Sequence, residues 1–239
     1  MIAAVLRAIF FDFNGILLDD EPIHLQALQR IFAEEGVTLS SEEYYDKYVG
    51  IDDQSCLRDV LNRSGREADQ ALVVRLVARK ASYYQERIQR DGYSFFPGAI
   101  SLVESAAAGS LTLAVVSGAL RQEVEDALRN VGFRSLFKAV VAAEDVRRGK
   151  PDPEGYLAAI EELNSRSPLP ERLFHPHEIL AVEDTLPGLQ AAASAGLVTL
   201  GVAHTQTRKD LDIADVRVEE LDDVTPESLQ AWYAEASRS

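Results

Sequence analysis

Short apolar runs spaced along the chain limit its fold more than any other feature of the sequence. Five of them are strong, at 5–11, 111–117, 138–143, 178–184 and 197–203, and a weaker sixth covers 214–218. Runs that are apolar on both faces are typical of parallel strands covered by helices on both sides of a sheet. Segments with helical spacing lie between them, at 121–132, 152–163 and 185–196. This alternation predicts an α/β fold with a Rossmann-like, doubly wound parallel sheet.

Residues 19–93 interrupt the alternation, because they contain only helical patterns. Gly92, Pro97 and Gly98 mark the return to the alternating pattern. We therefore expect a Rossmann-like core formed by residues 1–18 and 94–239, and an all-helical cap domain inserted at 19–93. Doubly wound sheets bind ligands beyond the carboxyl ends of their strands. A helical insertion after the first strand should therefore cover that edge.

Polar side chains stand at or near the ends of the first four strong runs. They are Asp12, Ser117, Lys150, Glu183 and Asp184. Because the carboxyl ends of parallel strands meet at one edge of a sheet, we expect these side chains to converge. Carboxylates are hard oxygen ligands that suit Mg²⁺, and lysine and serine can hold phosphate oxygens. A carboxylate nucleophile beside a divalent metal predicts a site for phosphoryl transfer.

Charge and composition exclude several classes of partner. The chain carries 24 basic and 39 acidic residues, a formal net charge of −15. Such a chain should repel nucleic acid and anionic membranes. No apolar run approaches the roughly 18 residues that a membrane helix needs. Cys56 is the single cysteine, which fits a reducing compartment and leads us to expect a cytoplasmic protein.

Four motifs follow one another in the chain, each at the end of a predicted strand or at the start of a predicted helix. They are DFNG (12–15), VVSGA (115–119), GKPDPEGY (149–156) and VEDTLPG (182–188). With this ordered set the sequence resembles the haloacid dehalogenase (HAD) superfamily of hydrolases, in subfamily I, whose helical C1 cap follows the first motif. Within that branch it is similar to the group of β-phosphoglucomutase and phosphoglycolate phosphatase. The resemblance covers nearly the whole chain.

The resemblance implies a phosphatase that acts on a small phosphorylated metabolite through an aspartyl-phosphate intermediate. Asp12 matches the nucleophile of the family. Lys150 matches the lysine that neutralises the nucleophile and the transferring phosphoryl group. Ser117, with the backbone of Gly118 and Ala119, matches the position that binds phosphate oxygens. We expect a monomer or a weak homo-oligomer.

The same resemblance implies a Mg²⁺ cofactor and a substrate contact from the cap. The metal ligands would be Asp12, Glu183, Asp184 and the backbone carbonyl of Asn14. His24 matches a histidine early in the first cap helix of β-phosphoglucomutase, so we expect it to contact the substrate.

Asn14 departs from the family pattern, in which this position is the general acid/base aspartate. The backbone carbonyl is unaffected by the change, and the amide could donate a hydrogen bond to a leaving oxygen. However, an amide cannot exchange a proton, and general acid/base catalysis contributes about 10²–10⁴-fold. Three interpretations stay open. The first is a working enzyme, either for substrates with good leaving groups or with another group, such as His24 or a water, that serves for poorer ones. The second is a catalytically impaired relative that binds phosphate and metal, and the third is a deliberate Asp-to-Asn change that traps a substrate complex.

Other chemistries of the superfamily are less favoured. A phosphomutase would need its acid/base at position 14, and Val49 and Asp53 occupy positions that are basic in the cap of β-phosphoglucomutase. Dehalogenation needs no metal, whereas the pair of acids at 183–184 indicates a metal site. Phosphonate hydrolysis needs a Schiff-base lysine in the cap, and Lys47 and Lys80 lie in no context typical of one.

Overall fold

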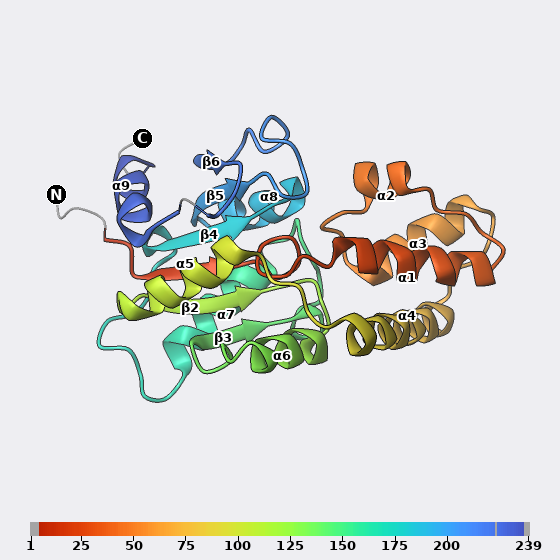
Figure 1. Cartoon of the computed structure of the whole chain (residues 1–239), viewed down its shortest axis with the longest axis horizontal. Coiled ribbons are helices and arrows are strands. Elements are labelled where there is room, and N and C mark those ends of the chain that lie inside the picture. The colour runs from red at the N-terminus through yellow and green to blue at the C-terminus, as the bar shows by residue number, and fades with distance from the viewer. Residues whose placement is uncertain (1–4, 223, 237–239) are drawn as a thin grey trace.

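A parallel sheet of six strands forms the centre of the larger lobe in the computed structural model (Figure 1). The structure describes residues 5–222 and 224–236. The strand order is β3-β2-β1-β4-β5-β6, and every neighbouring pair is parallel. The strands are β1 (Ala8–Phe11), β2 (Thr112–Val116), β3 (Phe137–Val141), β4 (Ile179–Glu183), β5 (Val198–Val202) and β6 (Val216–Val218). The chain moves outward in both directions from β1 and β4, so the topological switch point lies between these two strands.

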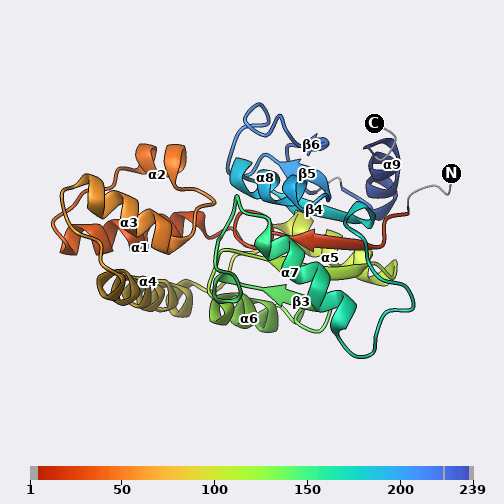
Figure 2. The ribbon, with the colours of Figure 1, turned by 180° about the vertical axis from the view of Figure 1, so that it is seen from behind.

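Helices cover both faces of the sheet (Figures 1 and 2). One face packs against α5 (Pro97–Ala108), α6 (Arg121–Asn130) and α9 (Pro226–Ala236), and the other against α7 (Glu154–Ser165) and α8 (Leu186–Ser194). In β1, Ile9 and Phe11 belong to the first hydrophobic cluster and Ala8 and Phe10 to the second, all of them fully buried. The predicted α/β fold with strands apolar on both faces is therefore confirmed.

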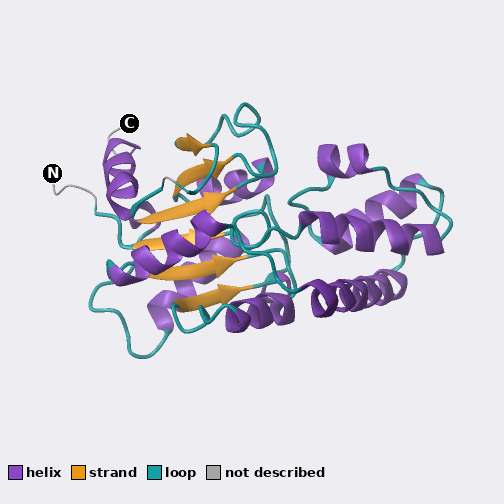
Figure 3. Cartoon of the chain, viewed as in Figure 1, coloured by secondary structure: helices purple, strands orange, loops and turns teal. Residues whose placement is uncertain are grey.

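Four helices between β1 and α5 form a smaller lobe beyond the carboxyl ends of the strands (Figure 3). They are α1 (Glu21–Glu34), α2 (Ser41–Lys47), α3 (Asp53–Arg63) and α4 (Gln70–Asp91). This lobe has a hydrophobic cluster of its own, built from residues such as Phe32, Leu57 and Leu76. Two stretches, between β1 and α1 and between α4 and α5, connect it to the sheet.

The sequence did not predict α5 and α9. The first of them begins with Pro97 and Gly98, a pair that usually marks a loop. Proline is nevertheless well tolerated at the first position of a helix, where its missing N–H would have no partner. The two short 3₁₀ helices, η1 (Ala143–Asp145) and η2 (Pro176–Glu178), were not predicted either.

Candidate active site

Asp12 and Lys150 form a buried ion pair at the switch point of the sheet. Asp12 directly follows β1. Its Oδ1 accepts a hydrogen bond from the backbone N–H of Phe13 (2.7 Å) and forms an ion pair with Lys150 Nζ at 2.8 Å. Lys150 Nζ also lies 2.7 Å from Glu183 Oε1, at the end of β4. Burial lowers the pKa of Lys150, but the charges of Asp12 and Glu183 outweigh it and raise this pKa above its ordinary value. Lys150 is therefore a permanent cation between two carboxylates.

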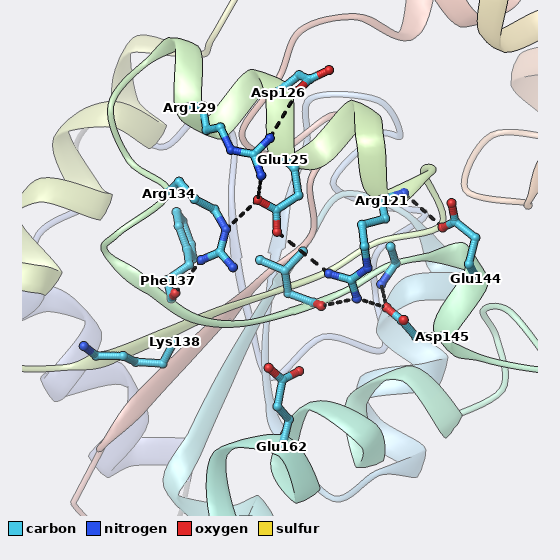
Figure 4. Close-up of polar contacts among 12 residues, drawn as sticks. Arg121, Glu125, Asp126, Arg129, Arg134, Phe137, Lys138, Glu144, Asp145 and Glu162 are labelled. Carbon is cyan, nitrogen blue, oxygen red and sulfur yellow. Dashed lines mark hydrogen bonds and ion pairs between the residues drawn. The ribbon is translucent and has the colours of Figure 1, made fainter. Parts of the chain in front are cut away.

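The segment before Lys150 is anchored to the start of α6 (Figure 4). The backbone N–H of Arg121 donates to Glu144 Oε2 (2.9 Å), and its guanidinium donates to the carbonyl of Val140 (2.9 Å) and to Asp145. These contacts hold η1 against the end of β3.

Three acids meet at the same edge of the sheet. Asp12, Glu183 and Asp184 each offer an oxygen, and these oxygens lie within 4.8 Å of one another. Glu183 is 0% exposed and Asp184 is 2% exposed. Burial and the neighbouring Asp12 raise the pKa of Glu183 to about 8, against the opposing effect of Lys150. Burial and Asp12 also hold the pKa of Asp184 well above its usual value.

This group of acids fits a divalent cation. Glu183 Oε2 and Asp184 Oδ1 are buried oxygens with no hydrogen-bond partner in the described part of the chain. Buried carboxylate oxygens without a donor are costly, and hard cations such as Mg²⁺ prefer oxygen ligands of this kind. A single lysine balances three carboxylates here, so one further cation would satisfy both the charge and the unpartnered oxygens.

Gly15 is needed for the approach of the first loop to Asp184. Its φ is +76°, a conformation that favours glycine. A Cβ at this position would lie 1.9 Å from Asp184 Oδ2. His204 adds a contact from the other side, because its Nδ1 donates to the carbonyl of Gly15 at 2.7 Å. No side chain larger than hydrogen fits at position 15 without moving Asp184.

The segment Ser117–Ala119 closes the site at the end of β2. The backbone N–H of Ser117 donates to the carbonyl of Val141 (2.9 Å), and its Oγ accepts from the N–H of Ala119 (3.0 Å). Because Oγ is an acceptor in that bond, the hydroxyl proton of Ser117 can still be donated to an anion. Gly118 and Ala119 line the same cavity as Asp12 and Lys150. The structure thus brings together the side chains that the sequence placed at the strand ends.

The side chain of Asn14 is directed toward α1 and α4. Its Nδ2 donates to both oxygens of Asp20, at 2.8 Å and 2.9 Å, and lies 2.9 Å from His24 Nε2. In this structure the amide donates to Asp20, so its donation to a leaving oxygen stays a prediction. Burial raises the pKa of Asp20, but the charge of His24 and hydrogen bonds from His24, Asn14 and Tyr84 outweigh it and lower this pKa.

His24 is buried in a polar network and has both ring nitrogens occupied. Its Nε2 lies 3.1 Å from Asp20 Oδ2, and its Nδ1 contacts Lys80 Nζ. The ring stacks on Tyr84 with a centroid distance of 4.7 Å. Lys80 Nζ also pairs with Asp53 Oδ2 at 2.9 Å. His24 lines the cavity, but its nitrogens contact neighbouring side chains.

The cavity lies between the strand ends and the helical lobe. From the lobe it is lined by Glu21, His24, Tyr44, Gly50, Ile51, Asp53 and Lys80. A groove of about 510 Å³ continues outward from it past Ser117, Lys150 and Asp53, toward Arg58 and Arg147. The roles of Asp20, Glu21 and Lys80 were not predicted from the sequence. One signal was available for Lys80, because it occupies the buried side of α4 between Leu76 and Tyr84 at a spacing of four.

Comparison with known proteins decides the family. The family model described as haloacid dehalogenase-like hydrolase matches residues 9–202. Protein CbbY of Rhodobacter capsulatus is 30% identical over 223 residues, which cover 90% of this chain and 94% of that protein.

The chain belongs to the haloacid dehalogenase-like hydrolase family.

Relatives of this HAD-family protein are named as phosphatases. The validoxylamine A 7'-phosphate phosphatase of Streptomyces hygroscopicus subsp. limoneus is 28% identical over 229 residues, covering 91% of this chain and 95% of that protein. The expectation of a HAD-type phosphatase that acts on phosphorylated substrates is thereby confirmed. Among the described residues, no helix is both long and apolar enough to cross a membrane.

Solved structures share the fold of this HAD-family enzyme. β-Phosphoglucomutase from Clostridium difficile superposes with a TM-score of 0.85 at 21% identity, covering 98% of this chain and all of that one (100%). CbbY from Rhodobacter sphaeroides, solved in complex with phosphate, gives a TM-score of 0.79 at 24% identity, covering 92% and 96% of the two chains. At these identities the likeness concerns the fold.

Proposed function

We propose that this protein is a Mg²⁺-dependent phosphatase of a small phosphorylated metabolite, with Asp12 as the nucleophile. The observation that carries the proposal is the buried Asp12 carboxylate, paired with Lys150 at 2.8 Å in a cavity that Gly118 and Ala119 also line. The hydrogen bond from Phe13 and the ion pair with Lys150 both fall on Oδ1 of Asp12. Among the contacts of the described residues none falls on Oδ2, so this oxygen would be available to a substrate or a metal.

The reaction would proceed in two displacements at phosphorus. In the first, an oxygen of Asp12 bonds to phosphorus, and the bond to the leaving oxygen breaks with its electron pair going to that oxygen. In the second, water attacks phosphorus and the bond to Asp12 breaks, which releases phosphate and restores the carboxylate. The proton of the attacking water passes to the released phosphate or to solvent. Lys150 and Ser117 would hold the phosphoryl oxygens in both steps, where preorganised donors are most effective.

Asp12, Asp184 and the backbone carbonyl of Asn14 would hold the metal, with Glu183 beside them. A bound Mg²⁺ would supply positive charge to the phosphoryl oxygens as negative charge spreads over them. The unpartnered Glu183 Oε2 and Asp184 Oδ1 support this assignment.

Asn14 would restrict the enzyme to substrates with good leaving groups. An amide neither gives nor takes a proton at neutral pH, so the leaving oxygen must depart as an anion or be protonated by solvent. Acyl phosphates, aryl phosphates and pyrophosphates meet this condition. The loss of general acid/base catalysis should cost about 10²–10⁴-fold on alkyl esters.

The helical lobe, which we propose as a cap over residues 19–93, would exclude water from the closed site. The residues of this lobe that line the cavity argue against a phosphomutase, which would bind a second phosphate there. Asp53 stands where the β-phosphoglucomutase cap is basic, and it pairs with Lys80 at 2.9 Å. Burial lowers the pKa of Lys80, but the charges of Asp53 and Glu123 outweigh it and raise this pKa. A lysine that stays protonated is also unsuited to the Schiff base of phosphonate hydrolysis.

Steady-state hydrolysis of p-nitrophenyl phosphate with Mg²⁺ tests the proposal. We expect turnover that disappears with a chelator and in Asp12→Asn, a variant of similar size that lacks the nucleophile. The competing proposal is a catalytically impaired relative, and it is favoured by the missing acid at position 14. Magnesium-dependent binding of phosphate without any turnover would support that alternative. A cytoplasmic location and a monomeric or weakly associated state remain predictions from the sequence.

A further inference from the structure

Asp20 is a buried carboxylate surrounded by donors at the junction between the first loop and α1. It is 1% exposed and immediately precedes α1. Its Oδ1 accepts from Asn14 Nδ2 at 2.8 Å. Its Oδ2 accepts from the same Nδ2 at 2.9 Å and from the hydroxyl of Tyr84 at 2.6 Å, and lies 3.1 Å from His24 Nε2. These contacts come from the first loop, α1 and α4.

The contacts of Asp20 determine which way the amide of Asn14 is turned. An ionised carboxylate can only accept hydrogen bonds, whereas a primary amide has one end that donates and one that accepts. The NH₂ end of Asn14 must therefore face Asp20, because the opposite orientation would place two acceptors against each other. The carbonyl oxygen, Oδ1, is turned away from Asp20, and Asn14 lines the cavity that contains Asp12.

We propose that Asp20 is a positioning residue for Asn14, and that positions 14 and 20 form a matched donor–acceptor pair which presents the amide oxygen of Asn14 to the cavity. The catalytic part of this inference rests on the proposed phosphatase function. In the cavity, Oδ1 can accept a hydrogen bond from the water that attacks the phosphorylated Asp12. It would orient that water without removing a proton from it.

The pairing with Asp20 explains why position 14 of this chain carries an amide. An aspartate at position 14 would bring a second carboxylate to within about 3 Å of Asp20, where like charges strongly oppose each other. Asn14→Asp alone should therefore disturb the site. Exchanging both residues should keep the hydrogen bond with donor and acceptor reversed, because Asn and Asp have the same shape.

Four proteins form the test: the unmodified chain, Asn14→Asp, Asp20→Asn, and the double variant in which both are exchanged. Thermal unfolding at pH 7 is measured first, without Mg²⁺. We expect each single change to lower Tm by roughly 5 °C or more, and the double variant to recover at least half of the loss. Asp19→Asn is the matched control, because the exposed neighbour Asp19 loses the same charge. Its Tm should stay close to that of the unmodified chain.

Turnover of an aryl and an alkyl phosphate is then measured on the same proteins with Mg²⁺. The double variant places an acid at position 14 with a matched partner, so its kcat on the alkyl ester should exceed that of the unmodified chain by about 10²-fold or more. The gain in kcat on the alkyl ester should be at least about tenfold smaller for Asn14→Asp alone than for the double variant. The ratio of alkyl to aryl turnover reports proton transfer, which a purely structural role of Asp20 would leave unchanged.

Two results would overturn the pairing. The first is an Asn14→Asp variant as stable as the unmodified chain and as active on alkyl esters as the double variant. The second is a double variant that is no more stable than the less stable of the two single variants. If none of the four proteins hydrolyses any ester but the unfolding data still show the recovery, the pairing stands and the proposed phosphatase function is what fails.

Discussion

Lys150 places its ammonium nitrogen 2.8 Å from Oδ1 of Asp12, in a site where both side chains are about nine-tenths buried. The same nitrogen reaches Glu183 at 2.7 Å. Removing this cation would leave two buried carboxylates without the positive charge that balances them, and breaking a buried ion pair in this way typically costs about 3–5 kcal/mol.

Lys150→Met should therefore lower both stability and activity. We expect the free energy of unfolding in urea to fall by about 3–5 kcal/mol without Mg²⁺, and phosphatase turnover to be lost. Lys138→Met on β3 is the matched control, because Lys138 is exposed. Equal stability and turnover in the two variants would contradict the role assigned to Lys150.

Binding of Mg²⁺ should strengthen as the pH rises. Without metal the pKa of Glu183 is about 8 and that of Asp184 is also raised. Metal ligands must be deprotonated, so the metal competes with protons for these acids. We expect the increase in Tm caused by Mg²⁺ to be larger at pH 8 than at pH 6, and to vanish in Asp184→Asn. An increase that does not depend on pH would show that the ion binds elsewhere.

The stabilising effect of Asp20 should disappear in acid. Its pKa is lowered in the folded protein from an ordinary value of 3.8, so the unfolded chain binds the proton first as the pH falls. The contribution is thus complete above pH 3.8 and is lost as the pH falls through the folded pKa. At pH 7, Asp20→Asn should cost about 1.5–3 kcal/mol. Unfolding curves measured down to pH 3 should show this difference shrinking, and a constant difference would argue against the hydrogen-bonded carboxylate.

Gly15→Ala should damage the metal site as well as the backbone. Gly15 and Gly36 both have a positive φ, of 76° and 70°. Only at Gly15 would an added Cβ meet other atoms, namely Asp184. We expect Gly36→Ala to cost roughly 1–2 kcal/mol with normal turnover, and Gly15→Ala to cost more and to abolish the response to Mg²⁺. Normal magnesium-dependent turnover in Gly15→Ala would contradict the packing of the first loop against Asp184.

The sequence predicted the parallel sheet and the convergence of Asp12, Lys150 and Glu183, because topology alone brings the carboxyl ends of parallel strands together. It did not predict the contact between His24 and Lys80, which are 56 residues apart on different helices. Such a contact depends on how α1 and α4 pack, and helical spacing identifies the buried side of each helix without naming its neighbour. The contact of Asn14 with Asp20 was missed for a similar reason, because it depends on the turn between β1 and α1.

The most direct test of the account is rapid-mixing kinetics with a chromogenic aryl phosphate and Mg²⁺, followed by mass spectrometry of the peptide that contains Asp12. Since Asn14 cannot take a proton from the attacking water, hydrolysis of the phosphorylated enzyme should be slower than its formation. We therefore predict a burst of about one phenolate per active site and phosphate on Asp12. Linear release without phosphate on Asp12, together with unchanged turnover in Asp12→Asn, would contradict the account.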